Sequence, residues 1–422
     1  MVFVLNKNKK PLNPCSNARA RKLLKQKKAV IHKKYPFTIR LKEKKELPTN
    51  PDYRLKIDYG SRYTGLSILN GNRVVWLGEL HHRTSIKKSM DSRRAHRRFR
   101  RSKLRYRQPR SLNRKRKSGW LPPTLRSRVS NIESIVKKLQ NAVPLTSISY
   151  ENVKFNTQLM QNPSISKTEY TQGTLHGYEV REYLLETYNR KCVYCGKENV
   201  PFEVEHITPK SRGGSNRISN LALSCRSCNR RKGSLTAKEF GYPHIQSKVN
   251  PPLRDVAIIN ATRQAVYNVL NSVGLPVECG TGGRTKMNRV LLELPKTHYY
   301  DACCVGESTP NKLIFKTSNV LTIKALGRGT RQRVSLDKYG FPRAYYSRQK
   351  RHFGFTSGDM VKAIVPKGKN KGTWYGSVSC RSRGDFNINI KEGRKQGINH
   401  RCFKLVQRAD GYKYMIEKKK GS

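Results

Sequence analysis

The sequence predicts a multidomain α+β protein. Its 422 residues are enough for about two to four domains at the usual ~100–200 residues per domain. Strand-like alternation fills residues 55–77 and returns in short runs after residue 312, whereas apolar residues recur at helical spacing between residues 129 and 139. Apolar residues make up 36% of the chain, which is sufficient for buried cores and argues against wholesale disorder.

The first 82 residues predict a small basic module followed by the start of a sheet. Residues 1–50 combine a helix-like stretch at 20–30 with a strand-like stretch at 35–41 and end in a Lys/Glu-rich linker. Two alternating apolar runs then flank Asn70-Gly71. Asn-Gly between such runs favours a tight hairpin turn, so residues 55–77 are expected to open an antiparallel sheet.

A strongly basic segment follows. Residues 83–128 hold nineteen Lys or Arg and one acid, Asp91. Residues 91–107 lack Gly and Pro and predict a helix with basic side chains all round, which has little apolar face for packing. A disordered basic linker is the alternative. We expect this helix to bind nucleic-acid phosphates through Arg93, Arg94, Arg97, Arg98, Arg100, Arg101 and Arg105.

The remaining segments alternate helices and strands. The stripe of Val129, Ile132, Ile135, Val136 and Leu139 predicts a core-packing helix, and residues 148–151 predict a strand that ends in a carboxylate. Further helices are expected at 178–189 and 255–272, followed by a segment that ends at 298–306. Residues 360–365, 373–378 and 386–390 alternate like strands and predict a β-rich C-terminal domain.

The charge identifies the class of partner. Lys and Arg number 88 and Asp and Glu 27, which gives a formal net charge of +61. A chain this basic needs a polyanion, and nucleic acid is the usual one. A membrane surface is the weaker alternative, since no apolar run approaches the ~18 residues of a spanning helix and no signal peptide is visible. We expect an intracellular protein of a bacterial cytoplasm or nucleoid, or of an organelle matrix.

Four cysteines form the most specific metal pattern. Cys192 and Cys195 make one Cys-x-x-Cys pair and Cys225 and Cys228 another, with 29 residues between the pairs. In a chain without a secretory signal this spacing indicates a metal site in a reducing compartment. Four thiolates suit one tetrahedral structural Zn²⁺. Taken alone, the pattern is compatible with a purely structural zinc module.

Polar residues beside the cysteines add a catalytic possibility. Glu205 and His206 stand at the end of a predicted strand, Asn220 follows, and Asn229 comes directly after Cys228. An imidazole and two oxygen ligands of this kind can surround a scissile phosphate and one Mg²⁺, with His206 as general base and Glu205 and Asn229 as metal ligands. The arrangement resembles the HNH (ββα-metal) nuclease motif.

A second constellation is dispersed along the chain. Asp58 and Glu151 end predicted strands, while His298 and Asp301 are spaced i, i+3 on a predicted helix capped by Thr297. If they converge, three acids and a histidine can bind two Mg²⁺ about 4 Å apart and support phosphodiester cleavage. Each residue alone is more commonly a surface group or a cap. The three surrounding segments resemble the split segments of a RuvC nuclease.

The order of these features resembles IscB, a family of transposon-encoded RNA-guided endonucleases related to type II CRISPR effectors. The resemblance covers essentially the whole chain and implies an RNase H-like RuvC core split into three segments. The implied domains are an N-terminal PLMP-like module (1–50), RuvC segment I (51–82), an Arg-rich bridge helix and linker (83–128), RuvC segment II (129–170), the HNH domain with linkers (171–245), RuvC segment III (246–307) and a target-adjacent-motif-interacting domain (308–422).

The resemblance also implies roles. The HNH site would cut the guide-paired DNA strand and the RuvC site the displaced strand, each with Mg²⁺ or Mn²⁺, while Asn220 would brace the HNH loop. Departures from the family pattern are Asn13, Tyr59 and Asn156, none of which removes an expected ligand. The implied partners are target double-stranded DNA and a long structured guide RNA. A ~20 bp heteroduplex carries only about 40 phosphates, fewer than the net charge of +61, so we expect a long RNA to supply the remaining negative charge. We expect a monomeric ribonucleoprotein.

Two other functions stay open at this point. A free-standing HNH endonuclease of the homing type would read DNA through protein contacts and would carry no guide. A non-enzymatic RNA-binding zinc protein would account for the charge and the cysteines. It would leave Glu205-His206 and the pair His298 and Asp301 without a purpose.

Overall fold

The computed structural model describes residues 1–47, 51–104, 117–153, 180–247, 249, 254–327, 332–390 and 392–419. The chain divides into two compact units. Met1–Val153 and Ile258–Ser422 form the first, here called the sheet unit, and Lys154–Ala257 form the second, here called the inserted unit. Of the segments that the sequence singled out, Arg105 and Asn156 lie outside the described residues.

The N-terminal module is a small sheet with one helix. Its four strands follow the order β2-β1-β4-β3 and surround a core of short aliphatic side chains that includes Val4, Leu12 and Ile39. Ser16 caps the helix by accepting a hydrogen bond from the backbone N–H of Arg19. The elements are β1 (Val2–Leu5), β2 (Pro11–Cys15), α1 (Asn17–Lys25), β3 (Ala29–Lys33) and β4 (Thr38–Leu41).

The centre of the sheet unit is an eight-stranded mixed sheet of order β11-β8-β5-β6-β7-β13-β23, with β12 beside β7. Strands β5, β6 and β7 are antiparallel, and the turn at Asn70 and Gly71 joins β6 to β7 as predicted. β8 and β11 extend the sheet in parallel. The strands are β5 (Arg54–Tyr59), β6 (Tyr63–Asn70), β7 (Arg73–His81), β8 (Ser147–Glu151), β11 (Val277–Gly280), β12 (Ile314–Phe315), β13 (Asn319–Ala325) and β23 (Tyr412–Lys418).

Side-chain alternation gives this sheet two different faces. Leu55, Ile57 and Tyr59 of β5 point into the main core. Helices α3 (Pro123–Gln140) and α8 (Arg254–Asn271) contribute to the same core. The predicted stripe from Val129 to Leu139 is buried on α3, which confirms its packing role.

The other face of the sheet receives the short helix α10 (His298–Cys303). Tyr299, Tyr300 and Cys303 pack there against strands β6 and β7. Thr297 caps α10, as predicted, by accepting a hydrogen bond from the backbone N–H of Tyr300. Helix α9 (Gly282–Leu291) precedes α10 in the chain. Asp58 of β5 alternates with the core residues and therefore lies on the α10 side.

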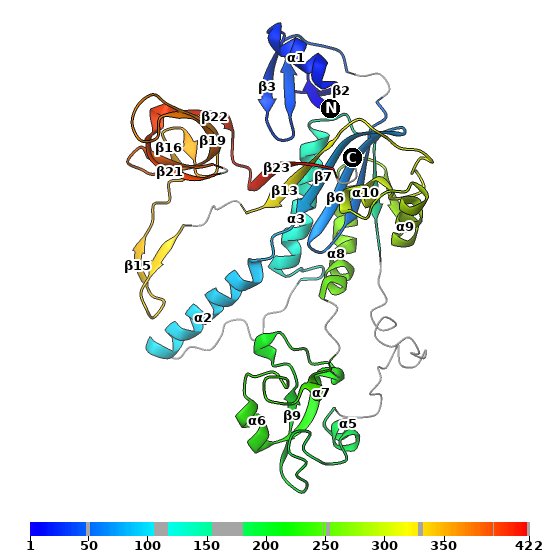
Figure 1. Cartoon of the computed structure of the whole chain (residues 1–422), viewed down its shortest axis with the longest axis vertical. Helices are drawn as coiled ribbons and strands as arrows, with labels where there is room; N and C mark the ends of the chain where they lie inside the picture. Colours follow the sequence, from blue (N-terminus) through cyan, green and yellow to red (C-terminus); the bar gives the residue numbers. More distant parts are fainter. Residues whose placement is uncertain are drawn as a thin grey trace. The chain divides into compact units, whose positions relative to one another are not determined.

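The C-terminal region contributes two strands to the large sheet. The predicted C-terminal domain spans residues 308–422, and within this range β13 and β23 pair with each other while β13 pairs in parallel with β7. Figure 1 shows these yellow and red strands beside the blue strands of the N-terminal half. The edge of β7 offered unsatisfied backbone groups, and distant segments satisfied them. The remaining C-terminal elements, β14 to β22, lie between these two strands in the chain.

Between β13 and β23 lie two short hairpins and a five-stranded antiparallel sheet of order β21-β20-β19-β18-β22. The predicted strands at 360–365, 373–378 and 386–390 are confirmed, and their apolar side chains form a core around Phe386. The elements are β14 (Val334–Leu336), β15 (Pro342–Tyr345), β16 (Arg351–His352), β17 (Phe355–Thr356), β18 (Met360–Val365), β19 (Gly372–Ser379), β20 (Asp385–Ile390), β21 (Gly393–Asn399), η3 (His400–Cys402) and β22 (Phe403–Gln407).

The inserted unit has a ββα arrangement. Strands β9 (Phe202–His206) and β10 (Leu221–Cys225) pair in antiparallel fashion, and α6 (Arg226–Lys232) follows β10 directly. Its other elements are α5 (Val180–Thr187), η1 (Lys210–Arg212), η2 (Ile218–Asn220) and α7 (Pro243–Ser247). Across the described parts of both units, no helix has the length and apolar character to span a membrane.

The basic segment contains one long helix, α2 (Ile86–Leu104). It begins before the predicted start at residue 91, and its end coincides with the last described residue before 117. Arg93, Arg94, Arg97 and Arg98 are exposed, and Arg100 and Arg101 are half-buried. The helix therefore presents cationic side chains over most of its surface.

Candidate functional site

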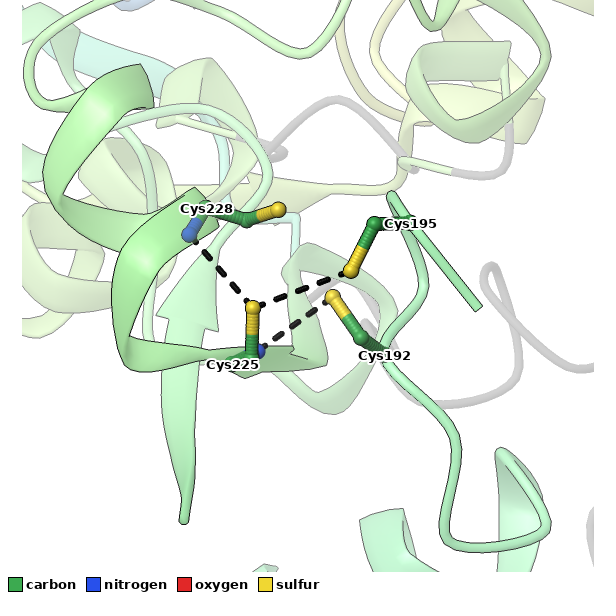
Figure 2. Close-up of side chains that lie close together, drawn as sticks. All are labelled: Cys192, Cys195, Cys225 and Cys228. Carbon is green, nitrogen blue, oxygen red and sulfur yellow. Dashed lines mark hydrogen bonds between the residues drawn. The ribbon is translucent and has the colours of Figure 1, made fainter. Parts of the chain in front are cut away.

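The four predicted cysteines converge in the inserted unit. Their Sγ atoms all lie within 4.8 Å of one another, and Figure 2 shows the four side chains turned toward a common centre. The sulfurs of Cys195 and Cys225 are 3.8 Å apart. Four sulfurs bound to one zinc at about 2.3 Å would be about 3.8 Å apart in a tetrahedron, so the cluster fits a structural Zn²⁺.

The local fold explains this convergence. Cys225 ends β10 and caps α6, where its sulfur accepts a hydrogen bond from the backbone N–H of Cys228. The N–H of Cys225 in turn donates to the sulfur of Cys192 at 3.3 Å. Burial opposes ionisation of Cys192, but backbone N–H groups outweigh it and lower the pKa of this thiol to about 7. A thiolate is the form that binds metal.

Glu205 is buried beneath the zinc module. Its Oε1 pairs with the ammonium group of Lys232, and its Oε2 accepts a hydrogen bond from the hydroxyl of Tyr194 at 2.7 Å. Lys232 is also buried and donates to the backbone oxygen of His206 at 3.0 Å. Both carboxylate oxygens of Glu205 are thus engaged by the protein itself. The sequence predicted a metal ligand here, whereas the structure places this side chain in a buried ion pair.

The other predicted residues of this motif have different partners. Asn229 on α6 donates from Nδ2 to Oε2 of Glu203 at 2.6 Å. His206, the last residue of β9, has its Nε2 3.0 Å from Oδ1 of Asn216. Glu203 and Glu205 are two positions apart on one strand, so their side chains point to the same face of the strand. This is the face that carries their partners on α6, Asn229 and Lys232. Glu203 is therefore the acid that the structure brings to Asn229, and sequence reasoning missed it.

Asn220 braces the loop that follows His206. Its Oδ1 accepts from the N–H of Thr208 at 2.8 Å, and its Nδ2 donates to the backbone oxygens of Thr208 and Ser215. The loop also closes tightly at Gly214, where an added Cβ would lie 1.7 Å from the oxygen of Thr208. These contacts fix the backbone on both sides of Asn216, the partner of His206.

The second candidate site lies on the α10 face of the large sheet. Asp58 is at the end of β5, and Glu151 is at the end of the neighbouring parallel strand β8. Parallel neighbours end at the same edge, and the register of Ile57 with Tyr150 places the two acids in adjacent positions. Helix α10 adds His298 and Asp301 above them. The four predicted residues therefore come from three distant segments to one face.

Direct contacts join part of this group. His298 donates from Nδ1 to Oδ2 of Asp58 at 3.0 Å. Asp301 forms an ion pair with Arg289 of α9, with Oδ1 2.7 Å from Nε. Among the residues with described positions, the four cysteines are the only group of three or more His, Cys, Asp or Glu side chains that could hold a metal ion. The acids of the sheet unit share a face but do not form such a group.

Electrostatics shows that these carboxylates interact. Burial, followed by the charge of Asp58, raises the pKa of Glu151 to about 7. Burial and then Asp58 also raise the pKa of Asp301, against the opposing charge of Arg289. The hydrogen bond to Asp58 raises the pKa of His298. Like charges gathered in a partly buried place favour a bound cation, and carboxylate oxygens are ligands suited to Mg²⁺.

A close backbone approach places α10. An added Cβ on Gly65 of β6 would lie 1.7 Å from the backbone oxygen of His298. Only glycine leaves room for the helix to settle on the sheet at this point. Arg289 and Gly65 carried no motif in the sequence, since their importance depends on residues that are distant along the chain.

Comparisons with known proteins agree with part of this picture. A family model described as RRXRR protein matches residues 2–173, and one described as HNH endonuclease matches residues 192–235. No curated protein matches the chain. The second family match confirms the predicted HNH endonuclease domain, which contains the four cysteines, Glu205, His206, Asn220 and Asn229.

Among solved structures, three complexes of Streptococcus thermophilus Cas9 are similar, solved with the GGAA, AGAA and AGGA PAMs. Their identities are 16%, 14% and 12%, and their TM-scores are 0.37, 0.35 and 0.34. Each comparison covers 61% of this chain and 32% of the Cas9 chain. The chain thus spans about a third of the length of these proteins.

Proposed function

We propose that this protein is an RNA-guided, metal-dependent DNA endonuclease of the IscB type with two active sites. The observation that carries the proposal is the presence of two separate groups of acids and histidines, one inside the HNH endonuclease match and one on the sheet unit. A nuclease with a single site would need only one of them. The HNH site would cut the guide-paired strand and the sheet site, as a RuvC site, the displaced strand.

In the HNH site, His206 would take the proton from the attacking water. His206 ends β9, and its imidazole contacts Asn216 of the loop that Asn220 braces. A bound Mg²⁺ would offset negative charge on the leaving oxygen. Asn229 would supply an oxygen ligand. For Glu205 to supply another, its carboxylate has to leave Lys232 and Tyr194, whereas Glu203 already contacts Asn229.

In the RuvC site, Asp58, Glu151 and Asp301 would hold the metal ions, and His298 would orient Asp58 and face the substrate. The donor set fits Mg²⁺ or Mn²⁺, because it offers three carboxylates whose mutual repulsion a divalent cation would relieve. Strands from all three proposed segments, β5 to β7, β8 and β11, lie in one sheet, which supports the proposed split core. Arg289 would have to release Asp301 when metal binds.

The guide would be a long structured RNA. The charge of +61 and the exposed arginines of α2 support a large anionic partner. Helix α2 would grip guide phosphates as a bridge helix, and the five-stranded sheet of the C-terminal region would read the flanking duplex. Base pairing would select the target. The zinc would hold the inserted unit together.

Strand-specific nicking tests the proposal. Asp58→Ala and His206→Ala should each leave a nickase, on opposite strands, with the affected cut slowed about 10²-fold or more. Asp52→Ala and His244→Ala replace exposed residues outside the two sites and serve as matched controls. The measurement is cleavage of DNA labelled separately on each strand. Loss of both cuts in either variant would contradict the two-site assignment.

Guidance is tested by sequencing the RNA that purifies with the protein. A specific structured RNA whose removal abolishes target cleavage is the expected result. Intact cutting without such an RNA would favour a free-standing HNH endonuclease of the homing type. Absence of any metal-dependent nicking would favour a non-enzymatic RNA-binding zinc protein.

A further inference from the structure

A short hairpin on the sheet unit combines aromatic and basic side chains. The β14–β15 hairpin, defined here as residues 332–348, contains two antiparallel strands in which Val334 pairs with Tyr345. Each residue of β15 is exposed, whereas two of the three residues of β14 are half-buried. Tyr345 and Tyr346 expose 66% and 55% of their surface. Isolated two-stranded hairpins are marginally stable in water, so such a surface needs a partner.

The turn of this hairpin is anchored on the Arg-rich helix. Oδ1 of Asp337 accepts hydrogen bonds from the N–H groups of Tyr339 and Phe341 at 2.9 and 2.8 Å, which shapes the turn. The ring of Tyr339 stacks on Phe99 of α2, with centroids 6.0 Å apart and planes 20° apart. An added Cβ on Gly340 would lie 2.9 Å from Nδ1 of His96. The hairpin therefore extends the surface of α2.

The charges of the hairpin match a polyanion. The hairpin contains one acid, Asp337, and four basic residues: Arg333, Lys338, Arg343 and Arg348. That carboxylate is already engaged by backbone N–H groups of the turn. On α2, the exposed residues Arg97 and Arg98 lie between the two residues that contact the turn. The combined surface is cationic, as phosphate binding requires.

The aromatic residues indicate which form of nucleic acid fits. Exposed aromatic rings bind single strands by stacking on bases, whereas bases in a duplex already stack on each other. The guanidinium of Arg333 lies 5.5 Å from the centroid of the Tyr346 ring and holds that side chain near a cation. The hairpin thus offers a base-stacking surface beside phosphate-binding groups.

We infer that the β14–β15 hairpin and the adjoining part of α2 bind single-stranded RNA, with Tyr345 and Tyr346 stacking on unpaired bases. Arg333, Arg343 and the arginines of α2 neutralise the adjacent phosphates. The choice of RNA rests on the proposed function, in which α2 holds the guide. The hairpin then binds a segment of that RNA outside its base-paired regions.

Binding of short oligonucleotides to the full-length protein tests the stacking. Replacing both tyrosines in Tyr345→Ala/Tyr346→Ala should weaken binding of a mixed-sequence single-stranded RNA about tenfold or more. Tyr345→Phe/Tyr346→Phe keeps the rings and should bind nearly as the parent. Phe37→Ala is the matched control, because Phe37 is an exposed aromatic residue, at 37%, of the N-terminal module, to which no nucleic-acid contact is assigned. An abasic RNA of equal length should bind the parent weakly and the alanine variant equally weakly.

Three results would overturn the inference. They are unchanged RNA affinity in the alanine variant, an equal loss with the abasic RNA, and a larger loss with a duplex than with the single strand. An unchanged unfolding midpoint checks that the variant is folded. Photocrosslinking of the particle purified with its RNA should join Tyr345 or Tyr346 to ribonucleotides. Crosslinks only elsewhere would reject this inference, whereas a particle without RNA would reject the proposed function itself.

Discussion

The two candidate sites are built in opposite ways. The HNH residues lie within residues 192–232, on two paired strands, the helix that follows them and the short segments before each strand. In the sheet unit, the hydrogen bond between His298 and Asp58 joins residues 240 positions apart. The first site depends on a small local fold and a metal cluster, and the second on the correct assembly of a large sheet. Substitutions that disturb one of these structures should therefore affect one site more than the other.

The sites also differ in how they hold negative charge. Buried Glu205 is neutralised by buried Lys232, whereas Asp58 and Glu151 lie in adjacent positions and Asp58 accepts a hydrogen bond from His298. One feature is common to both: a glycine permits the closest backbone approach, Gly214 beside Thr208 and Gly65 beside His298. Four changes test whether the two sites differ in these ways.

Loss of the zinc cluster should have the largest effect and should be confined to the inserted unit. Structural zinc contributes apparent binding free energies of about 10–16 kcal/mol in small zinc-finger peptides. Cys225→Ser should therefore unfold the inserted unit, as seen by loss of hydrogen-exchange protection. Cys279→Ser changes an exposed cysteine of β11 and is the control. Equal loss of protection in the large sheet would contradict the separation of the two units.

Breaking the buried ion pair should come next. Lys232→Met leaves the carboxylate of Glu205 buried without its cation, and such a change costs about 3–5 kcal/mol. The double variant Glu205→Leu/Lys232→Met should recover much of that loss. Lys191→Met removes an exposed pair with Glu198 and should change stability by less than about 1 kcal/mol. Chemical unfolding of the zinc-loaded protein measures all three variants, and equal losses in the single and double variants would exclude the proposed cause.

Adding a methyl group under α10 tests the long-range site. Gly65→Ala should destabilise the sheet unit by about 1–3 kcal/mol or displace His298, because the new Cβ overlaps a backbone oxygen. Under the proposed function, cleavage of the displaced strand should fall while cleavage of the guide-paired strand persists. Gly283→Ala is the matched control, since an added Cβ there meets no atom within 4 Å. Parallel loss of both cuts would argue against independent sites.

The smallest effect concerns pH in the metal-free protein. The pKa of Glu151 is raised from 4.5 to about 7, so the folded state binds more protons than the unfolded state between these values. Its contribution to stability is present below pH 4.5 and is lost as the pH rises through 7. Glu151→Gln should remove about 1–3 kcal/mol of this pH dependence. Added Mg²⁺ should flatten the same slope in the parent, and an unchanged slope in the variant would reject this cause.

Local patterns in the sequence predicted several of the elements and the cluster of four cysteines. The Asn70-Gly71 turn, the apolar stripe of α3 and the Thr297 cap follow from spacing and side-chain chemistry within a few residues. The cysteine spacing likewise predicted a cluster whose four sulfurs do converge. These features need no knowledge of the rest of the chain, because turns, helix faces and metal ligands act over short distances.

Contacts between distant segments could be learned only from the folded chain. In the folded chain, β13 and β23 join the central sheet, and the β14–β15 hairpin contacts α2. Glu205 forms an ion pair with Lys232, and Asp301 forms one with Arg289. The sequence pattern predicts a strand, and the sequence itself shows an acid. Neither identifies the strand that pairs with the first or the cation that pairs with the second. Pairing of strands and neutralisation of buried charge depend on the packed chain as a whole, which is why the sequence named the acids but not their partners.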